Sequence, residues 1–281
     1  MRFSLNSTLA YEVEQPTPFV FNVEAAACER QTVAAESLTF SQLLEPDRFL
    51  MPETGNRYVR VVAQPGPLTV EYRAEIDLDP VVDDPASITE IGPAHLPLET
   101  VPHLNPSRFC QSDKLQRFAQ RQFGALALGH QRVTAVCNWI HDNVDYVSGS
   151  TDALTSAFDI VTERSGVCRD FAHLSISLCR ALGIPSRYVS AYAWQLTPPD
   201  FHAAMECFLH GPSGPRWYLF DATRKAALDG LVRIGVGRDA ADVPFAAQFG
   251  SSKTEPPRVW IDGQGPTEPG LTIRAISLSA S

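Results

Sequence analysis

Three residues that together support thiol chemistry follow one another along the chain in the order cysteine, histidine, aspartate. Cys168 lies in "ERSGVCRDFAHLSISLCRALGIPSRYV", His202 follows the loop "QLTPPD", and Asp221 lies in "YLFDAT". A thiolate attacks carbonyl carbons, a histidine moves the proton, and an acidic side chain orients the imidazole ring. This set of residues predicts nucleophilic catalysis by a cysteine, provided that the fold brings the three side chains together.

The cysteine stands where a helix is expected to begin. From Phe171 to Leu182, apolar residues recur at intervals of three, four and four, and Gly183 then ends the pattern. The sequence therefore predicts a helix that runs from near Cys168 to Leu182. The free N–H groups and the positive dipole end of a first helical turn stabilise an anion, so they favour a thiolate at Cys168. The backbone N–H of Cys168 could also stabilise a developing oxyanion.

The histidine and the aspartate are expected on the two arms of a hairpin. The segments "FHAAMECFLH" and "RWYLFDAT" flank "GPSGP". If Leu209 pairs with Arg216, His202 and Asp221 share one face, whereas a shift of one residue would turn them to opposite faces. Apolar neighbours would bury Asp221, and a buried carboxylate needs a partner. The sequence leaves the register open, and the triad hypothesis predicts it.

The other cysteines are interpreted as structural. The chain has six cysteines and no C-x-x-C pair. Cys179 would lie about 16 Å from Cys168 along the helix, whereas bridged Cα atoms are no more than roughly 7 Å apart. Cys137 falls on the apolar stripe of a second predicted helix, and both Cys137 and Trp139 are expected to be core residues there. Reduced thiols and the lack of a signal-peptide pattern at the N-terminus predict a cytoplasmic protein.

Three parts of the chain are predicted to position these residues. Residues 1–100 read as a β-rich domain, a small antiparallel sheet or sandwich, because runs at 58–63 and 68–76 are rich in β-forming residues around a Pro-Gly-Pro turn. Residues 101–250 hold the helices, the first with Ser112 or Asp113 as its N-cap, and the Cys, His and Asp motifs. Residues 251–281 read as an extended C-terminal tail with little core of its own.

Composition excludes several function classes. The net charge is −9 and the sequence pI is about 5.2, without any run of basic residues. We therefore expect no nucleic-acid partner and no membrane association. No H-E-x-x-H motif, zinc-knuckle spacing or D-x-[DN]-x-[DN]-G calcium loop occurs, so we expect neither a metal nor a cofactor. The sequence does not indicate an oligomeric state.

The motifs also resemble a known family. The segments "SGVCRDFAHLSISLCRALGIPSRYVSAY", "DFHAAMECFL", "WYLFDATR" and "GRDAADVPF" resemble the bacterial transglutaminase-like family, which includes candidate cysteine proteases. The resemblance extends from Asn105 to about Phe245, and the first hundred residues resemble the region that accompanies this domain. It implies an α+β fold: a papain-like core of helices packed on an antiparallel sheet, preceded by a β-rich N-terminal domain. It also implies a catalytic triad of Cys168, His202 and Asp221.

The reaction implied is acyl transfer through a thioester, with a protein or peptide as substrate. The scissile bond would be a peptide, isopeptide or glutamine side-chain amide, and we favour hydrolysis because cross-linking would be hazardous in the cytoplasm. Two alternatives remain open: acyl transfer to a small amine, and a peptide-binding module without catalysis.

Charged residues beside the motifs are given structural roles. Asp170, in the first turn of the helix, is expected mainly to compensate the helix dipole. Arg238, Asp239 and Asp242 in "GRDAAD" are expected to form an ion-paired loop that shapes the cleft.

Overall fold

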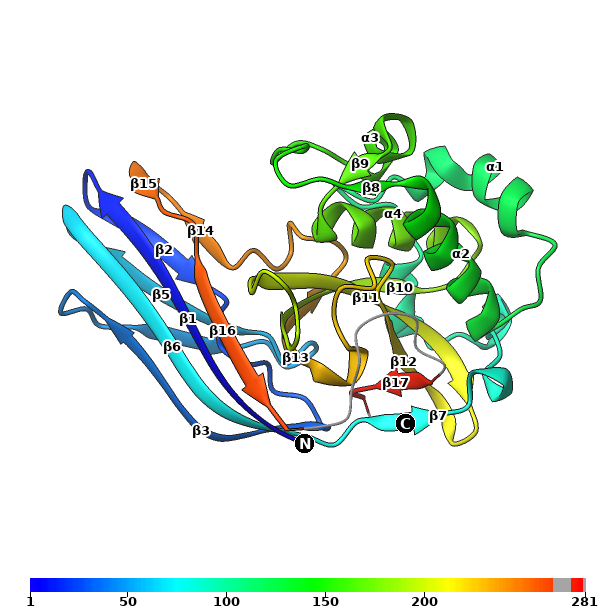
Figure 1. The fold of residues 1–281 in the computed structure, drawn as a ribbon, viewed down its shortest axis with the longest axis horizontal. Helices are drawn as coiled ribbons and strands as arrows, with labels where there is room; N and C mark the ends of the chain where they lie inside the picture. The colour runs from blue at the N-terminus through cyan, green and yellow to red at the C-terminus, as the bar shows by residue number, and fades with distance from the viewer. Residues whose placement is uncertain (265–273, 280–281) are drawn as a thin grey trace.

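The protein combines a β-sandwich with a domain of helices packed on a sheet (Figure 1). The structure is a computed structural model that describes residues 1–264 and 274–279. The sandwich lies on the left of Figure 1, and the helices lie at the upper right above the second domain's sheet. Strand pairing within the sandwich and the main sheet of the second domain is antiparallel, so the predicted α+β class is confirmed.

Two sheets form the sandwich. One has the order β15-β1-β6-β3, with β16 also paired to β1, and the other has the order β14-β2-β5-β4. The strand bounds are β1 Arg2–Val13, β2 Thr17–Phe21, β3 Gln31–Phe40, β4 Asp47–Leu50, β5 Arg57–Ala63, β6 Gly66–Leu78, β14 Ala246–Gln248, β15 Ser252–Thr254 and β16 Arg258–Gly263.

Alternation of apolar residues explains the sandwich. On β1, Phe3, Leu5, Leu9 and Tyr11 point into the core and are buried, whereas most residues between them are partly exposed. The two β-rich runs of the sequence are β5 and β6, but these strands belong to different sheets. The Pro-Gly-Pro turn between them therefore carries the chain from one layer to the other, and the sandwich alternative is the correct one.

The C-terminal segment differs from the predicted extended tail. Strands β15 and β16 both pair antiparallel with β1, so the described end of the chain returns to the N-terminal domain; Figure 1 shows these orange strands beside the blue ones. Strand β17 (Ala275–Ser277) pairs with β7 (Val81–Asp83), and its residues are buried. Residues 265–273 and 280–281 of the predicted tail lie outside the described residues. These strands could not be predicted from the sequence, because they are short and are stabilised by pairing partners that lie far away in sequence.

The second domain is built around helix α4 and a sheet of order β12-β11-β10-β13. Nearly every residue of α4 is buried, because it packs on β10 and β11 and is covered by the other α-helices. The bounds are α1 Ser112–Phe123, α2 His130–Asn143, β8 Asp145–Tyr146, α3 Ala157–Glu163, β9 Ser165–Gly166, α4 Cys168–Ala181, β10 Ser186–Ala193, β11 Phe201–Gly211, β12 Gly214–Phe220 and β13 Leu231–Gly237. Short 3-10 helices lie at η1 Pro85–Ser87, η2 Pro93–His95, η3 Leu98–His103 and η4 Leu228–Gly230.

Helix α1 begins one position from where its cap was predicted. Ser112 is its first helical residue, and Gln111 occupies the N-cap position without a side-chain hydrogen bond. Within the described residues, no helix is long and apolar enough to cross a membrane.

One face of the β10–β13 sheet joins the core of the sandwich. Val189, Ala191 and Tyr192 of β10 belong to the same buried cluster as the apolar residues of β1 and β6. The Tyr192 hydroxyl lies 2.8 Å from Ser7 Oγ and 2.7 Å from the Val23 carbonyl oxygen. The other face of the sheet packs against the helices. The sandwich is therefore packed tightly against the second domain and helps to define the cavity between them.

Candidate active site

Cys168 is the first residue of α4, as predicted from the apolar stripe. Asp170 orders this helix start: its Oδ2 accepts hydrogen bonds from the Val167 N–H at 3.0 Å and from Thr151 Oγ1 at 2.6 Å. Gly166 allows the close approach of the chain, because a Cβ there would lie 2.8 Å from the Cβ of Asp170. Asp170 thus holds the helix start in place through hydrogen bonds, beyond any effect on the dipole.

Cys168 differs in exposure from the cysteines of the helical core. Cys168 is partly exposed, whereas Cys110, Cys137, Cys179 and Cys207 are buried. Cys179 and Cys137 are core residues, as predicted, while Trp139 is only partly buried at the edge of that core.

His202 and Asp221 are brought together by the hairpin. Strands β11 and β12 pair with Leu209 opposite Arg216, which is the register that the triad hypothesis requires. His202 is the second residue of β11, and Asp221 directly follows β12. His202 Nε2 lies 2.9 Å from Asp221 Oδ2, with 0% and 3% of their side chains exposed. Asp221 also accepts hydrogen bonds from Thr223 N and Thr223 Oγ1, at 2.8 and 2.9 Å.

The electrostatics of this pair favour its charged form. Burial acts to lower the pKa of His202, but the charge and hydrogen bond of Asp221, with a contribution from Cys168, raise that pKa to about 10. Burial acts to raise the pKa of Asp221, yet the His202 charge and hydrogen bonds from His202 and Thr223 leave it below its ordinary value. The arrangement therefore holds an imidazolium against a carboxylate at neutral pH.

The second ring nitrogen of His202 faces no partner of its own. Since Nε2 contacts Asp221, Nδ1 is the nitrogen left for proton exchange, and it is buried without a hydrogen bond to any described residue. The Cys168 thiol lies near enough that its hydrogen-bonding and charge interactions raise the histidine pKa. Both side chains line one cavity of about 440 Å³.

Tyr146 is a neighbour of Cys168 that the sequence did not reveal. It pairs with Gly166 across the short β8–β9 bridge, and its ring lies 4.4 Å from Lys225 Nζ. Burial raises the pKa of Tyr146, the Cys168 thiol raises it further, and a hydrogen bond from the Cys168 N–H lowers it. The phenol therefore lies beside both the thiol and the backbone N–H of Cys168. Only the tertiary pairing shows this, because "VDYV" carries no local signal.

The loop that contains "GRDAAD" is partly as predicted. Arg238 and Asp242 form an ion pair at 2.9 Å. Asp239 differs, because its carboxylate is buried and accepts hydrogen bonds from the N–H groups of Phe109 and Ala241, each at 2.9 Å. The loop therefore fastens the segment before α1 to the rim of the cavity.

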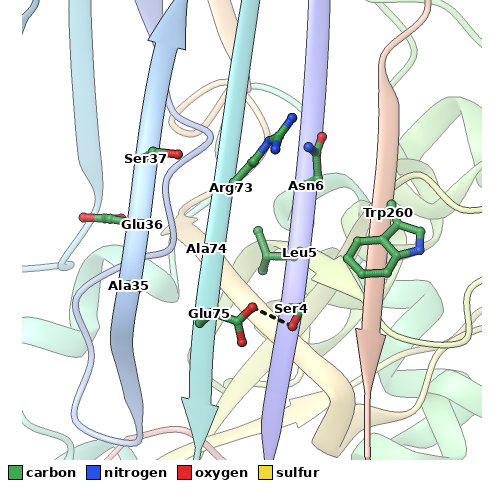
Figure 2. Close-up of a pocket in the computed structure, with 10 residues that line it drawn as sticks. All are labelled: Ser4, Leu5, Asn6, Ala35, Glu36, Ser37, Arg73, Ala74, Glu75 and Trp260. Carbon is green, nitrogen blue, oxygen red and sulfur yellow. Dashed lines mark hydrogen bonds between the residues drawn. The ribbon is translucent and has the colours of Figure 1, made fainter.

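A larger hollow of about 860 Å³ lies on the sandwich and has no lining residue in common with the cavity at Cys168. Figure 2 shows Ser4, Asn6, Arg73, Glu75 and Trp260 along adjacent strands of one sheet. Several of its polar side chains bond to neighbours in the same sheet, such as Ser4 Oγ to Glu75 Oε1 at 2.7 Å. No cysteine or histidine lines it, so the thiol chemistry belongs to the smaller cavity.

Comparisons with known proteins agree with this architecture. Residues 116–222, which include Cys168, His202 and Asp221, match the transglutaminase-like superfamily, and residues 1–97 match the bacterial transglutaminase N-terminal domain. The crystal structure of a candidate cysteine protease from Cytophaga hutchinsonii is similar over 99% of this chain and 98% of its own, with 41% identity and a TM-score of 0.93.

Two curated relatives are similar over a shorter region. An uncharacterised protein of Mycobacterium leprae is 32% identical over 120 residues, and one of Mycobacterium bovis is 30% identical over 163 residues. The matched regions span 41% and 51% of the lengths of these relatives. On the matches to both of its domains and the similarity over its whole length to the Cytophaga protein, the chain belongs to the transglutaminase-like superfamily.

Proposed function

We propose that the protein is a cysteine hydrolase that cleaves amide bonds of a protein or peptide substrate through a thioester on Cys168. The observation that carries this proposal is the buried His202–Asp221 pair, 2.9 Å apart, in the same cavity as a partly exposed cysteine at a helix start. This arrangement supports the proposal, because a thiol nucleophile needs a histidine that moves the proton and an acid that orients the ring.

Acylation would start from an ion pair, in which His202 Nδ1 already holds the proton of the Cys168 thiol and the sulfur is a thiolate. The thiolate attacks the carbonyl carbon of the amide, and the π electrons of the carbonyl move to its oxygen. The N–H of Cys168 and the hydroxyl of Tyr146, which lies beside it, would donate hydrogen bonds to this oxyanion. As the intermediate collapses, the C–N bond breaks, His202 protonates the leaving amine, and a thioester remains.

Deacylation reverses these roles with water. His202 Nδ1 takes a proton from water, the hydroxide adds to the thioester carbonyl, and the C–S bond breaks to release a carboxylic acid and the thiolate. Asp221 stabilises the imidazolium in both halves of the reaction because its carboxylate stays paired with Nε2. An amine in place of water would yield a transamidation product from the same thioester.

The test is a peptide assay read by mass spectrometry. The protein is incubated with unfolded protein digests and glutamine-containing peptides, with and without a fluorescent primary amine. New carboxyl termini or deamidated glutamines, absent with Cys168→Ala and His202→Ala, are the expected result. Incorporation of the amine in place of hydrolysis would contradict the hydrolase proposal, and peptide retention without any product would favour a binding module.

A further inference from the structure

The cavity beside Cys168 has a wall that the proposed chemistry does not use. Most of its lining is apolar and comes from three separate parts of the chain. Strand β1 of the sandwich supplies Leu9 and Tyr11, the second domain supplies Phe109 and Phe201, and the segment that returns to the sandwich supplies Phe245. The sandwich is therefore one wall of the catalytic cavity.

We propose that this cavity binds a large apolar side chain, aromatic or branched aliphatic, next to the scissile amide, and that the sandwich sets this preference. The inference rests on the proposed function, because it takes Cys168 as the nucleophile. A volume of about 440 Å³ lies within the range of about 300–1,000 Å³ for small-molecule sites. There is room for one large side chain and the adjoining substrate backbone.

The wall is held in place before any substrate arrives. The Tyr11 ring lies 4.9 Å from that of Phe19 in the opposite sheet, and Phe201 stacks on Phe245 with centroids 4.1 Å apart. Tyr11 is also paired with Leu68 on one side and Thr254 on the other. Because these contacts hold Tyr11 and Phe201 in place, the cavity is preformed. Binding of an apolar ligand therefore costs little conformational entropy of the protein.

The charges around the cavity disfavour an ionic side chain. Arg169 is ion-paired with Asp170 at 3.0 Å, and Glu255 is exposed at the rim. Burial raises the pKa of Tyr11 to about 12, so its hydroxyl stays neutral. A charged substrate side chain in this cavity would lose its hydration and find no unpaired opposite charge to replace it. Burial of an apolar side chain is favourable instead, because apolar surface is removed from water.

The experiment compares three alkylating reagents at Cys168: iodoacetamide, N-benzyl-iodoacetamide and N-(2-carboxyethyl)-iodoacetamide. Rate constants for Cys168 are measured by peptide mass spectrometry and divided by those for glutathione, which removes differences in intrinsic reactivity. We expect the benzyl reagent to exceed iodoacetamide by about tenfold to a hundredfold, as burial of an aromatic group would give. The carboxyethyl reagent should be slower than iodoacetamide.

Two exposed neighbours on β15 offer a matched pair of variants. Thr254 lines the cavity, whereas Lys253 does not, and both are solvent-accessible, so neither substitution disturbs the core. Thr254→Trp narrows the cavity and should abolish most of the benzyl preference, while Lys253→Trp should retain it. Ala246→Asp, which places a carboxylate in the same cavity, should also reduce the preference without filling it.

The outcomes separate this inference from the proposed function. Rapid labelling of Cys168 by all three reagents, with no benzyl preference or with a preference that Thr254→Trp leaves unchanged, would overturn the apolar specificity and leave the nucleophile in place. Slow labelling by iodoacetamide, at the rate of an ordinary thiol, would instead overturn the proposed function.

Discussion

Two opposing effects set the protonation state of His202. Burial alone would make its imidazole neutral, and the adjacent Asp221 carboxylate reverses that tendency, so its pKa rises to about 10. Removing one partner of a buried ion pair is strongly destabilising, because the remaining charge has lost its water and has no opposite charge to compensate it. The pair is therefore a structural element of the hairpin as well as a candidate catalytic group.

This protonation makes stability depend on pH in a defined direction. Because the pKa of His202 is raised from 6.5 to about 10 on folding, its contribution to stability is complete below about pH 6.5 and is lost as pH rises through about 10. We predict that the stability difference between wild type and His202→Gln is greatest near pH 6 and shrinks by pH 10, in urea unfolding at both values. His210→Gln, at the exposed end of the same strand, should show no such trend. A difference that is constant with pH would argue against the buried imidazolium.

Tyr146 gives a prediction that separates chemistry from thiol activation. Removal of one oxyanion donor costs about 10²–10³ in kcat, so Tyr146→Phe should lower kcat on the identified peptide by up to that factor. Alkylation by iodoacetamide forms no oxyanion, and its rate at Cys168 should be nearly unchanged. Tyr218→Phe, which removes a hydroxyl bonded to Asp83 at 2.7 Å, is the matched control and should keep its kcat. Equal losses in kcat and in alkylation rate would show that Tyr146 acts on the thiol instead.

At the residue scale, Cys168, His202 and Asp221 could be proposed from the sequence because the signals lie in the residues next to them. A glycine, an apolar stripe and a terminal Gly183 locate Cys168 at a helix start, and apolar neighbours make an unpaired Asp221 improbable. Tyr146 could not be found in this way, because it reaches Cys168 through the pairing of β8 with β9. The polar partners of Asp239 depend likewise on a segment far away in sequence.

Among the elements, helix α4 positions Cys168, and the backbone at Gly166 passes close to the first turn of this helix. A Cβ at Gly166 would lie 2.8 Å from the Cβ of Asp170 and 3.2 Å from Ile160 Cδ1. Both neighbours are buried, so the contact can be relieved only by moving the helix start.

We predict that Gly166→Ala lowers the free energy of unfolding by about 1–3 kcal/mol, as overpacking of a close contact does. It should also slow iodoacetamide labelling of Cys168, because the first turn shifts. Gly92→Ala is the control, since the only neighbour within 4 Å of its added Cβ would be a His95 ring nitrogen at 4.0 Å. Urea unfolding that gives the same midpoint for both variants would contradict the close packing at the helix start.

The hairpin shows which part of element pairing can be predicted. The register with Leu209 opposite Arg216 followed from asking which pairing puts His202 and Asp221 on one face, and the structure has that register. The partners of β5 and β6 did not follow from their pattern, because a short turn with Pro and Gly suits a hairpin as well as a crossing between layers. Chemistry at a site can thus fix a register that alternation alone leaves open.

At the scale of the whole molecule, strands from the first and from the last part of the described chain pair with each other. β1 pairs with β6 along one edge and with β15 and β16 along the other, and its core is continuous with that of the β10–β13 sheet. The sandwich and the second domain should therefore unfold together.

We predict that Val259→Asp, on β16, lowers the free energy of unfolding by about 2–4 kcal/mol, since Val259 is 9% exposed and a carboxylate there would lack a partner. Far-UV circular dichroism and tryptophan fluorescence should report one coincident transition. Trp260→Asp, one residue on and 51% exposed, should have a much smaller effect. Two separate transitions would mean that the domains are stabilised independently.

The role of the C-terminal strands could not be read from the sequence. "RVWIDG" is short and lies between proline- and glycine-rich stretches, and its stabilisation comes from pairing with residues about 250 positions earlier. The same long-range return builds the third wall of the cavity, and for this reason the sequence could suggest a nucleophile but not a specificity.

The most direct test of the central claim is the rate of iodoacetamide labelling at each cysteine from pH 4 to 10, read by peptide mass spectrometry in wild type and His202→Ala. Cys168 should label rapidly well below pH 8.5, where ordinary thiols react slowly, and His202→Ala should lose this behaviour. Cys28 is an internal control, because it is also only partly buried and burial raises its pKa. If Cys168 labels no faster than an ordinary thiol, or if His202→Ala changes nothing, Cys168 is not an activated nucleophile and the proposed mechanism is wrong.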